Sequence, residues 1–355
     1  MKPQGPLADA AALPGFLVRV LLVAAIAALA LAAWTVRDAF LLVFAAILLA
    51  VALHGVADVL TRSTRLNRPA ALAAAALLLT GTVVAILWVF GAQLANQLSG
   101  VADRLPEAWE RARQTLQTHP AGAALVSEIE AAGNGEGSAS IGGILTNAGG
   151  FALPLASGFT SGLLVFFIAA FLATSARSTR KGVLLLLPRG VDQKIGKAID
   201  ASGHALKKWL LGISIDMAIM TVVMGLTLWL LGVPAFLGLA LIAGIAQFVP
   251  TVGPLIAAIP GVLLAFTVSP LTALWTAIAY FTVSQLEANL VYPLIQKQTA
   301  SIPPALNLFA ILALGMLLGP LGVLLATPIL VVISVFVIQL YVRGTLGKDA
   351  PVPGA

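Results

Sequence analysis

Two long apolar segments in the C-terminal half of the chain, each interrupted by glycine and proline, constrain the fold most strongly. The first, Phe236 to Val268, is interrupted at residues 250–254 by PTVGP, and the second, Ala305 to Tyr341, is interrupted at residues 319–322 by GPLG. As straight helices they would be roughly 50–55 Å long at about 1.5 Å per residue. The hydrocarbon core of a bilayer is only about 30 Å thick. Each segment therefore has to bend, break or turn back inside the membrane.

The composition places the chain in a lipid bilayer. Of its 355 residues, 60% are hydrophobic and 10% are charged, whereas soluble domains average about 25% charged residues. The net charge of +6 does not indicate nucleic-acid binding, because the basic residues stand in loops beside apolar segments, where membrane lipids are the expected partner. The chain has no cysteine, which excludes disulfides, thiol nucleophiles and cysteine-based metal sites.

The expected fold is an all-α polytopic membrane protein with about six full transmembrane helices, two broken helical segments and a small extracytoplasmic helical insertion. Each single span has close to the roughly 20 residues that a bilayer requires. The expected full spans are residues 16–36, 39–60, 69–94, 151–175, 209–231 and 271–293. We favour re-entrant hairpins for the broken segments 236–268 and 305–341, because each half is too short to cross; two full crossings remain the alternative.

The predicted organisation divides the chain into five parts. They are N-terminal transmembrane scaffold helices (1–94), an extracytoplasmic insertion (95–150), a fourth transmembrane helix with a cytoplasmic interfacial helix (151–208), a transport domain with the broken helices (209–345) and a cytoplasmic tail (346–355).

The basic loops predict the orientation. Residues 61–69 carry three arginines and no acid, and residues 176–208 carry eight basic against two acidic residues. Residues 95–150 carry six acidic against three basic residues. Because cytoplasmic loops of membrane proteins are enriched in Lys and Arg, the first two regions are expected inside and the third outside. We therefore expect a multi-pass protein of the bacterial cytoplasmic (inner) membrane with both termini in the cytoplasm.

The helix breaks are the first candidate site for a solute. Opened backbone at membrane depth survives only inside protein or beside a polar cavity, and paired broken helices point to a transport site. The helix starting near Pro254 would direct its partial positive charge into the membrane, where it suits an anionic or oxygen-rich group. Opened carbonyls between Phe248 and Pro250 could hold a hydroxyl or a cation. The candidate binding residues at the breaks are Gln247, Pro250, Thr251, Gly253, Pro254, Gly319 and Gly322. The alternative is that these breaks only kink the helices.

Two acidic residues inside apolar spans are the second candidate site. Glu287 lies in the sequence QLEAN, where Gln285 and Asn289 flank it, and Asp216 lies in ISID. A carboxylate at the centre of a membrane helix costs at least about 2.5 kcal/mol, so such residues usually face a cavity or a partner. In the hairpin arrangement the two acids lie at the same depth, and in the crossing arrangement they lie on opposite sides. The alternative for each is a purely structural carboxyl group.

No enzyme pattern emerges from the sequence. A phosphate-binding loop of the GxxxxGK[ST] kind and the metal-binding HExxH motif are both absent. We therefore expect no enzymatic activity, no metal and no cofactor. H⁺ and Na⁺ are candidate coupling ions.

Several short motifs of the C-terminal half resemble one known family. They are LPR at 187–189, LGVP at 231–234, FVPTVGP at 248–254, AIP at 258–260, QLEAN at 285–289 followed by Pro293, IPP at 302–304, and GPLG at 319–322 followed by ATP at 326–328. Together they resemble the autoinducer-2 exporter family of bacterial membrane proteins, also called PerM-like permeases. The match is close over 180–345 and concerns only the helix layout over 16–175.

The resemblance implies an inner-membrane secondary transporter that forms a homo-oligomer, such as a pentamer. Family members are linked to export of the quorum-sensing signal autoinducer-2, and some to sodium(lithium)/proton antiport. The leading hypothesis is therefore export of a small polar metabolite by alternating access, with ion coupling through Glu287 as a subsidiary idea. The alternatives are a monovalent cation/proton antiporter and a non-transporting membrane scaffold.

Overall fold

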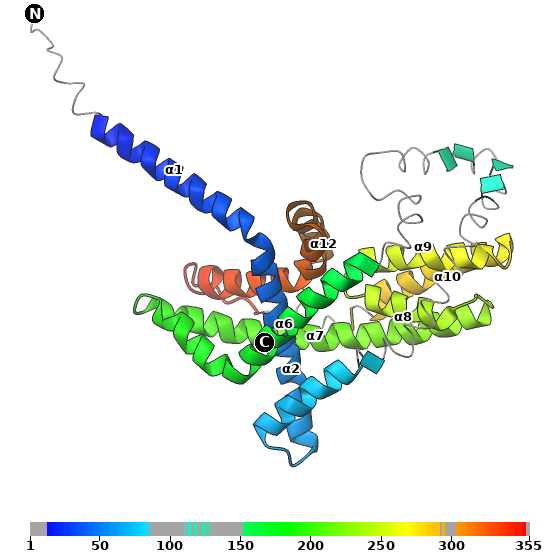
Figure 1. Cartoon of the computed structure of the whole chain (residues 1–355), viewed down its shortest axis with the longest axis horizontal. Coiled ribbons are helices and arrows are strands. Elements are labelled where there is room, and N and C mark those ends of the chain that lie inside the picture. Colours follow the sequence, from blue (N-terminus) through cyan, green and yellow to red (C-terminus); the bar gives the residue numbers. More distant parts are fainter. Residues whose placement is uncertain are drawn as a thin grey trace, which may run out of the picture.

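The computed structural model describes residues 13–82, 84–85, 152–291, 293–294 and 303–352, with single residues and pairs between 110 and 127. The regular structure in these parts of the chain is helical throughout (Figure 1). The expected extracytoplasmic insertion over 95–150 falls largely outside the described residues. The helical architecture confirms the predicted all-α class.

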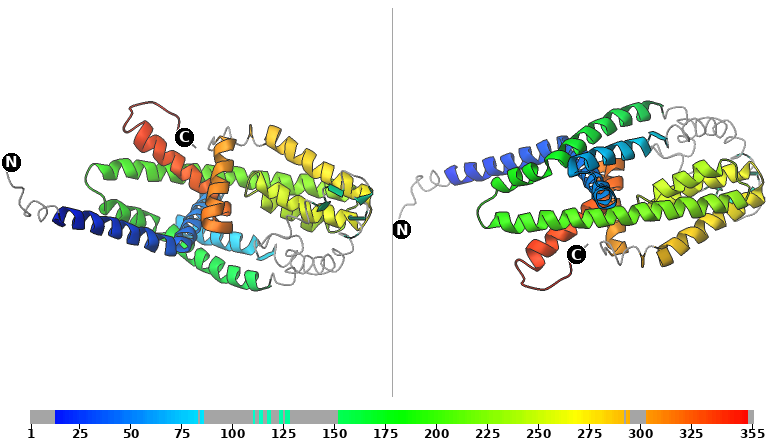
Figure 2. Two further views of the ribbon diagram at one scale, coloured as in Figure 1. Left: turned by 90° about the horizontal axis from the view of Figure 1, so that it is seen from above. Right: turned by 90° about the horizontal axis from the view of Figure 1, so that it is seen from below.

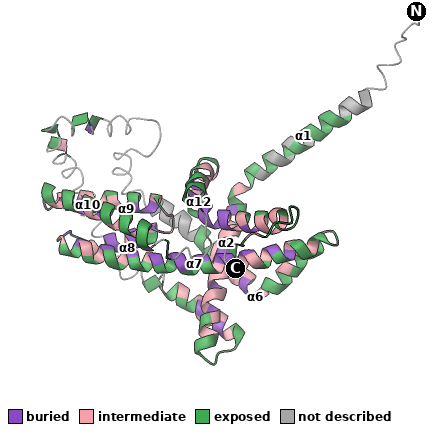
Figure 3. Cartoon of the chain, turned by 180° about the vertical axis from the view of Figure 1, so that it is seen from behind, coloured by how far each residue is buried: buried purple, intermediate pink, exposed green. Residues whose placement is uncertain are grey.

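The first helix projects away from the rest of the molecule. Helix α1 (Leu13–Thr35) has no acidic residue in its first turn and no basic residue in its last. It is joined by a one-residue turn to α2 (Arg37–Ser63) (Figure 1). Apolar side chains such as Leu22 and Leu31 are exposed along it (Figure 3). Because α1 is apolar and the other described helices leave it largely uncovered, a bilayer is the environment that suits it.

Helix α2, the helix Arg68–Thr82 and α6 (Ala152–Leu185) pack through small side chains. Asn67 begins the second of these helices, because its Oδ1 accepts a hydrogen bond from the backbone N–H of Ala70 at 3.1 Å. The buried residues at their contacts are almost all alanines: Ala46, Ala50, Ala57, Ala71, Ala75, Ala169 and Ala173, with Leu53. Small residues let helix backbones approach closely in membranes, so this cluster, called the alanine cluster below, forms a close-packed scaffold.

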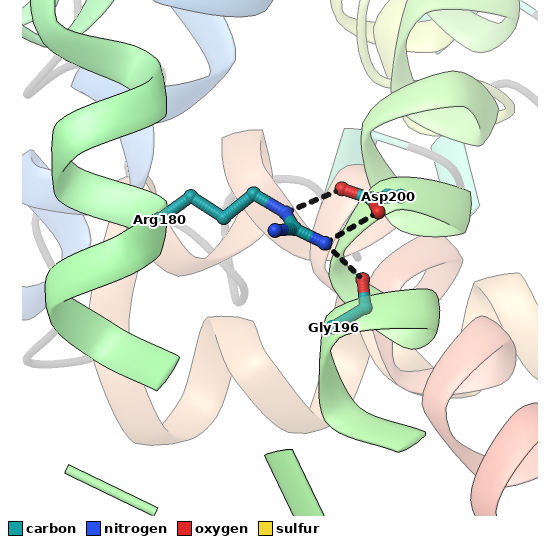
Figure 4. A network of polar contacts seen from close by, with 3 residues as sticks. All are labelled: Arg180, Gly196 and Asp200. Carbon is teal, nitrogen blue, oxygen red and sulfur yellow. Dashed lines mark hydrogen bonds and ion pairs between the residues drawn. The ribbon is translucent and has the colours of Figure 1, made fainter. Parts of the chain in front are cut away.

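Helix α7 (Val191–Leu230) is the longest of the described helices. At about 1.5 Å per residue its 40 residues extend for roughly 60 Å, so the segment expected as a separate interfacial helix continues directly into the fifth span. A bidentate ion pair fixes the hairpin between α6 and α7. Arg180 Nε and Nη2 each lie 2.7 Å from an oxygen of Asp200, and Nη2 lies 3.5 Å from the carbonyl oxygen of Gly196 (Figure 4).

Three shorter helices lie along the C-terminal half of α7 (Figure 2). They are α8 (Phe236–Ala246), α9 (Val252–Phe266) and α10 (Pro270–Leu286). Gly244 lets α8 approach α7, because a Cβ there would overlap the Thr221 side chain. Buried residues of all four helices, including Met220, Met224 and Tyr280, share one apolar core. The first over-long segment is thus two helices of 11 and 15 residues that turn back and pack against each other.

The second over-long segment is α12 (Pro304–Phe336), which bends sharply at Gly319 (φ 68°, ψ −155°). A Cβ on Gly315 would lie 2.7 Å from the Val323 side chain, and one on Gly322 would overlap the carbonyl oxygen of Leu314. In a straight helix, residues eight positions apart are separated by about 12 Å, so the chain folds over on itself here (Figure 2). Beyond the bend, α12 packs against α2 and α7 around Leu48, Trp209 and Leu325.

Four of the described helices are long and apolar enough to cross a membrane. They lie at Arg37–Ser63, Ser161–Leu185, Val191–Leu230 and Pro304–Val342, and three shorter apolar helices lie at Arg68–Thr82, Phe236–Ala246 and Val252–Phe266. Long spans combined with paired short apolar helices confirm the predicted polytopic membrane protein.

Candidate functional site

The site is built around the turn between α8 and α9, at the first helix break. Thr251, the residue before α9, has φ 74° and ψ −47°, an unusual conformation for a side chain with a branched Cβ. Position 253 requires glycine, because a Cβ there would overlap the carbonyl oxygen of Ala246 at the end of α8. Phe248 anchors the turn to α7 through an edge contact with Trp209, with ring centroids 5.5 Å apart. Such strained, tightly held turns are typical of ligand sites.

The turn already uses part of its own hydrogen-bonding capacity. The carbonyl of Val249 accepts from the N–H of Gly253 at 2.9 Å, and the carbonyl of Pro250 accepts from the N–H of Val252 at 2.9 Å. Pro254 has no N–H, so none of the first three residues of α9 offers a free donor. Each carbonyl oxygen can still accept a second bond. The break therefore suits a hydroxyl or a cation better than an anion.

The two membrane acids lie close enough to each other to interact electrostatically. Glu287, at the end of α10, lies beside the Gln247 side chain and within electrostatic range of Asp216 on α7. Asp216 and Gln247 are only 3% and 2% exposed. Neither Oδ1 of Asp216 nor Nε2 of Gln247 has a hydrogen-bond partner among the described atoms. Two neighbouring carboxyl groups with unused polar atoms form an arrangement that could hold a cation or a proton.

A cavity of about 440 Å³ opens beside Glu287, between α9, α10 and the start of α12. Five of the predicted site residues line it: Pro250, Thr251, Pro254, Gln285 and Glu287. Most of the other lining side chains are apolar, including Leu255, Val262 and Phe281. A mainly apolar cavity with a few convergent polar groups is the usual form of a small-molecule site.

Two buried polar residues of this cavity were not predicted from the sequence. Tyr280 and Asn307 line it and are 2% and 3% exposed, yet the Tyr280 hydroxyl and the Asn307 Oδ1 have no described partner. A signal for Tyr280 was present, because Thr276, Tyr280, Ser284 and Glu287 follow one another at spacings of four, four and three on α10. That spacing places them on one helix face. Asn307 gave no such signal, because it stands alone in an apolar helix.

The helical geometry changes at the acid itself. Residues Glu287–Val291 form a short π-helix that continues α10. Single π-helical turns inside α-helices occur frequently at functional sites, because they break the regular pairing of backbone groups. The irregular backbone thus begins at Glu287, the acid predicted from the sequence as a candidate site residue.

The remaining predicted residues lie elsewhere. Asn289 is exposed, and its Nδ2 donates to the carbonyl of Gln285 at 2.7 Å on its own helix. Gly319 and Gly322 form the bend of α12, and neither lines the cavity. The start of that helix reaches the cavity instead, through Pro304 and Asn307. No group of three potential metal ligands occurs within the part of the chain that the structure describes.

Comparisons with known proteins agree with this architecture. A family described as AI-2E family transporter matches residues 22–342. The chain is 29% identical over 173 residues to YrrI of Bacillus subtilis (strain 168), which covers 49% of each chain. It is 32% identical over 175 residues to MT0215 of Mycobacterium tuberculosis (strain CDC 1551 / Oshkosh), which covers 48% of this chain and 46% of the relative. Both relatives carry provisional names as transport proteins. The matches thus span about half the length of these relatives.

Proposed function

Because the chain belongs to the AI-2E family of transporters, we propose that it exports a small polar metabolite similar to autoinducer-2. Transport proceeds by alternating access, in which the helices α8, α9 and α10 move against the scaffold formed by α2, the helix Arg68–Thr82 and α6. A membrane transport role follows from the family. The substrate, the motion and the coupling are our proposal.

The cavity beside Glu287 is the observation that carries this proposal. It combines an apolar wall with buried polar groups that lack partners among the described residues, namely the Tyr280 hydroxyl and the side-chain amide oxygen Oδ1 of Asn307. A buried polar group without a partner costs roughly 1–3 kcal/mol, and a bound hydroxyl-rich solute would remove that cost. The volume of about 440 Å³ falls within the range of small-molecule pockets. A small polyol matches these features better than a large or fully apolar compound.

The helix break supplies a place for movement. The five residues between α8 and α9, 247–251, are the only covalent link between these two helices. Thr251 holds a strained backbone angle there, and strained residues absorb conformational changes at hinges. The Phe248–Trp209 contact ties this hinge to α7, so a rotation of the hairpin would be transmitted to the neighbourhood of Asp216.

A second candidate function is antiport of a monovalent cation against protons. The juxtaposition of Glu287, Asp216 and Gln247 favours it, because two carboxylates and an amide supply the oxygen ligands that hard cations prefer. In this case the same acids bind the ion, and the cavity beside Glu287 serves as its access path.

Flux through purified protein in proteoliposomes tests both functions. The export hypothesis predicts counterflow of autoinducer-2, and the antiport hypothesis predicts counterflow of labelled sodium with a matching pH change. Glu287→Gln removes the charge at nearly constant shape, so we expect it to abolish the pH dependence of flux. Asn289→Ala is the matched control, since that side chain lies two residues away but is exposed and bonded only to its own helix.

Equal flux and equal pH dependence in wild type and Glu287→Gln would remove the coupling role of this acid. Sodium counterflow without autoinducer-2 counterflow would replace the leading function by antiport. If neither solute moves while the reconstituted protein remains folded, transport of both solute classes is excluded.

A further inference from the structure

A second cavity, remote from the candidate site, lies between α2, the helix Arg68–Thr82 and α6. Its volume is about 740 Å³. It occupies the end of these helices where the basic loops occur, next to the alanine cluster. None of its lining residues belongs to the cavity beside Glu287, so the proposed transport function does not account for it.

The lining of this cavity is positively charged at one level and apolar at another. Arg68, Arg177 and His54 line it, and no acidic residue does. Arg68 begins its helix, and Arg177 lies two residues beyond the bend of α6 at Ser175 (φ −110°, ψ 17°). Residues one or two helical turns farther from these cations are apolar: Leu72, Ala73, Ala76, Ala170 and Ala173, together with Leu53.

The neighbouring charges leave this positive character in place. Asp58 lies within electrostatic range of Arg68 and His54 but does not line the cavity. Its carboxylate is already engaged by Lys207, whose Nζ lies 2.6 Å from Asp58 Oδ2. The Nδ1 of His54 faces the carbonyl of Ala50 at 2.9 Å. The two guanidinium groups are exposed and can therefore turn toward a ligand that enters the cavity.

We propose that this cavity binds an anionic phospholipid, with its phosphate between Arg68 and Arg177 and an acyl chain along the alanine-lined wall. Guanidinium groups match phosphate oxygens in charge and in bidentate geometry. Basic pockets between transmembrane helices at the cytoplasmic side are suited to anionic headgroups. A soluble phosphate compound would use the same cations but would leave the apolar wall of the cavity unoccupied. The bound lipid would brace α6 against α2 at the bend.

Lipid retention in nanodiscs measures this directly. Full-length protein is exchanged between phosphatidylglycerol and phosphatidylcholine nanodiscs, and retained phospholipid is counted by native mass spectrometry. We expect Arg68→Gln with Arg177→Gln to lower phosphatidylglycerol retention on the order of tenfold, since each basic residue contributes to anionic-lipid binding. The control, Arg65→Gln with Lys181→Gln, removes the same charge from exposed positions outside the cavity and should change retention less than about twofold. Equal losses in the two double variants, or no loss in either, would overturn the proposal.

A second measurement leaves both arginines in place and therefore does not depend on how the charge variants fold. Because the chain has no cysteine, Ser178→Cys gives one thiol at the cavity, and Ser63→Cys gives one at an exposed position outside it. The rate of labelling with neutral N-ethylmaleimide should fall severalfold at position 178 in phosphatidylglycerol relative to phosphatidylcholine, and should not change at position 63. Equal rates at position 178 would contradict a lipid site. Protection of position 178 by inorganic phosphate in phosphatidylcholine, to the same degree as by phosphatidylglycerol, would replace the lipid by a soluble phosphate ligand.

Discussion

The scaffold of α2, the helix Arg68–Thr82 and α6 differs from the bundle of α7 to α10 in what fills the space between helices. In the scaffold, alanines meet alanines and the backbones approach closely. In the bundle, large side chains such as Met220, Met224 and Leu264 surround polar groups. All six buried polar side-chain atoms without a partner among the described residues lie on α7, the α8–α9 turn, α10 or α12, and none lies on the three scaffold helices.

The contrast shows how one membrane protein can combine a stiff part with a part that binds. Close packing of small residues gives dispersion contacts along the whole helix, and the described part of the scaffold has no buried side-chain polar atom without a partner. Partnerless polar atoms are costly, and they persist where a solute, an ion or water can supply the missing bond. We therefore expect the scaffold to stay rigid during transport, and the bundle to move and bind the solute.

The largest expected effect comes from adding one methyl group at the helix break. Gly253→Ala places a Cβ against the Ala246 carbonyl oxygen, which the backbone can relieve only by opening the α8–α9 turn. We expect a loss of about 2–3 kcal/mol in the free energy of unfolding, measured by thermal unfolding in detergent, together with loss of flux. Gly203→Ala is the control, since a Cβ there has no neighbour within 4 Å. Similar stability of the two variants would show that the turn is loosely held.

An intermediate effect is expected for overpacking the scaffold. Ala75 is completely buried in the alanine cluster, so Ala75→Leu should separate the helices and cost about 1–2 kcal/mol of unfolding free energy. Flux per folded molecule should change little, because the cavity beside Glu287 is remote from this residue. Leu77→Ala, at a position that is 75% exposed, should shift stability by less than about 0.5 kcal/mol. If Ala75→Leu leaves the free energy of unfolding unchanged, the alanine cluster is not close-packed.

The smallest effect on stability is expected at Tyr280, where the substitution should not destabilise the protein. Its ring packs over Gly261, where a Cβ would lie 2.6 Å from ring carbon Cε2, and Phe keeps that packing. Tyr280→Phe removes only the partnerless hydroxyl, so stability should stay constant or rise by up to about 1 kcal/mol, while autoinducer-2 flux falls. Tyr341→Phe, at an exposed position outside the cavity, should change neither quantity. A marked loss of stability in Tyr280→Phe would mean that the hydroxyl serves the core.

Sequence reasoning located the helix breaks better than it located the residues of the site. The breaks at 250–254 and at Gly319 followed from segment length and from proline and glycine, which act locally. The prominence of Glu287 followed from the cost of burying a carboxylate. Asn289 and Gly322 were predicted on similar grounds. Asn289, however, does not line the cavity and bonds to its own helix, and Gly322 lies at the bend of α12. Which face a residue presents depends on helix rotation, and a short apolar segment does not specify rotation.

The sequence by itself determined that this chain lies in a membrane, where its helices are interrupted and which acids stand inside apolar segments, because hydrophobicity and backbone restrictions act within a few residues. Tertiary structure alone decided that Glu287, Gln247 and Asp216 come together from three different segments, that Tyr280 and Asn307 complete a cavity, and that Arg68 and Arg177 share another. These contacts depend on how α7 to α10 pack together, and on how α2, the helix Arg68–Thr82 and α6 pack together. Packing of this kind joins surfaces that are distant in the sequence.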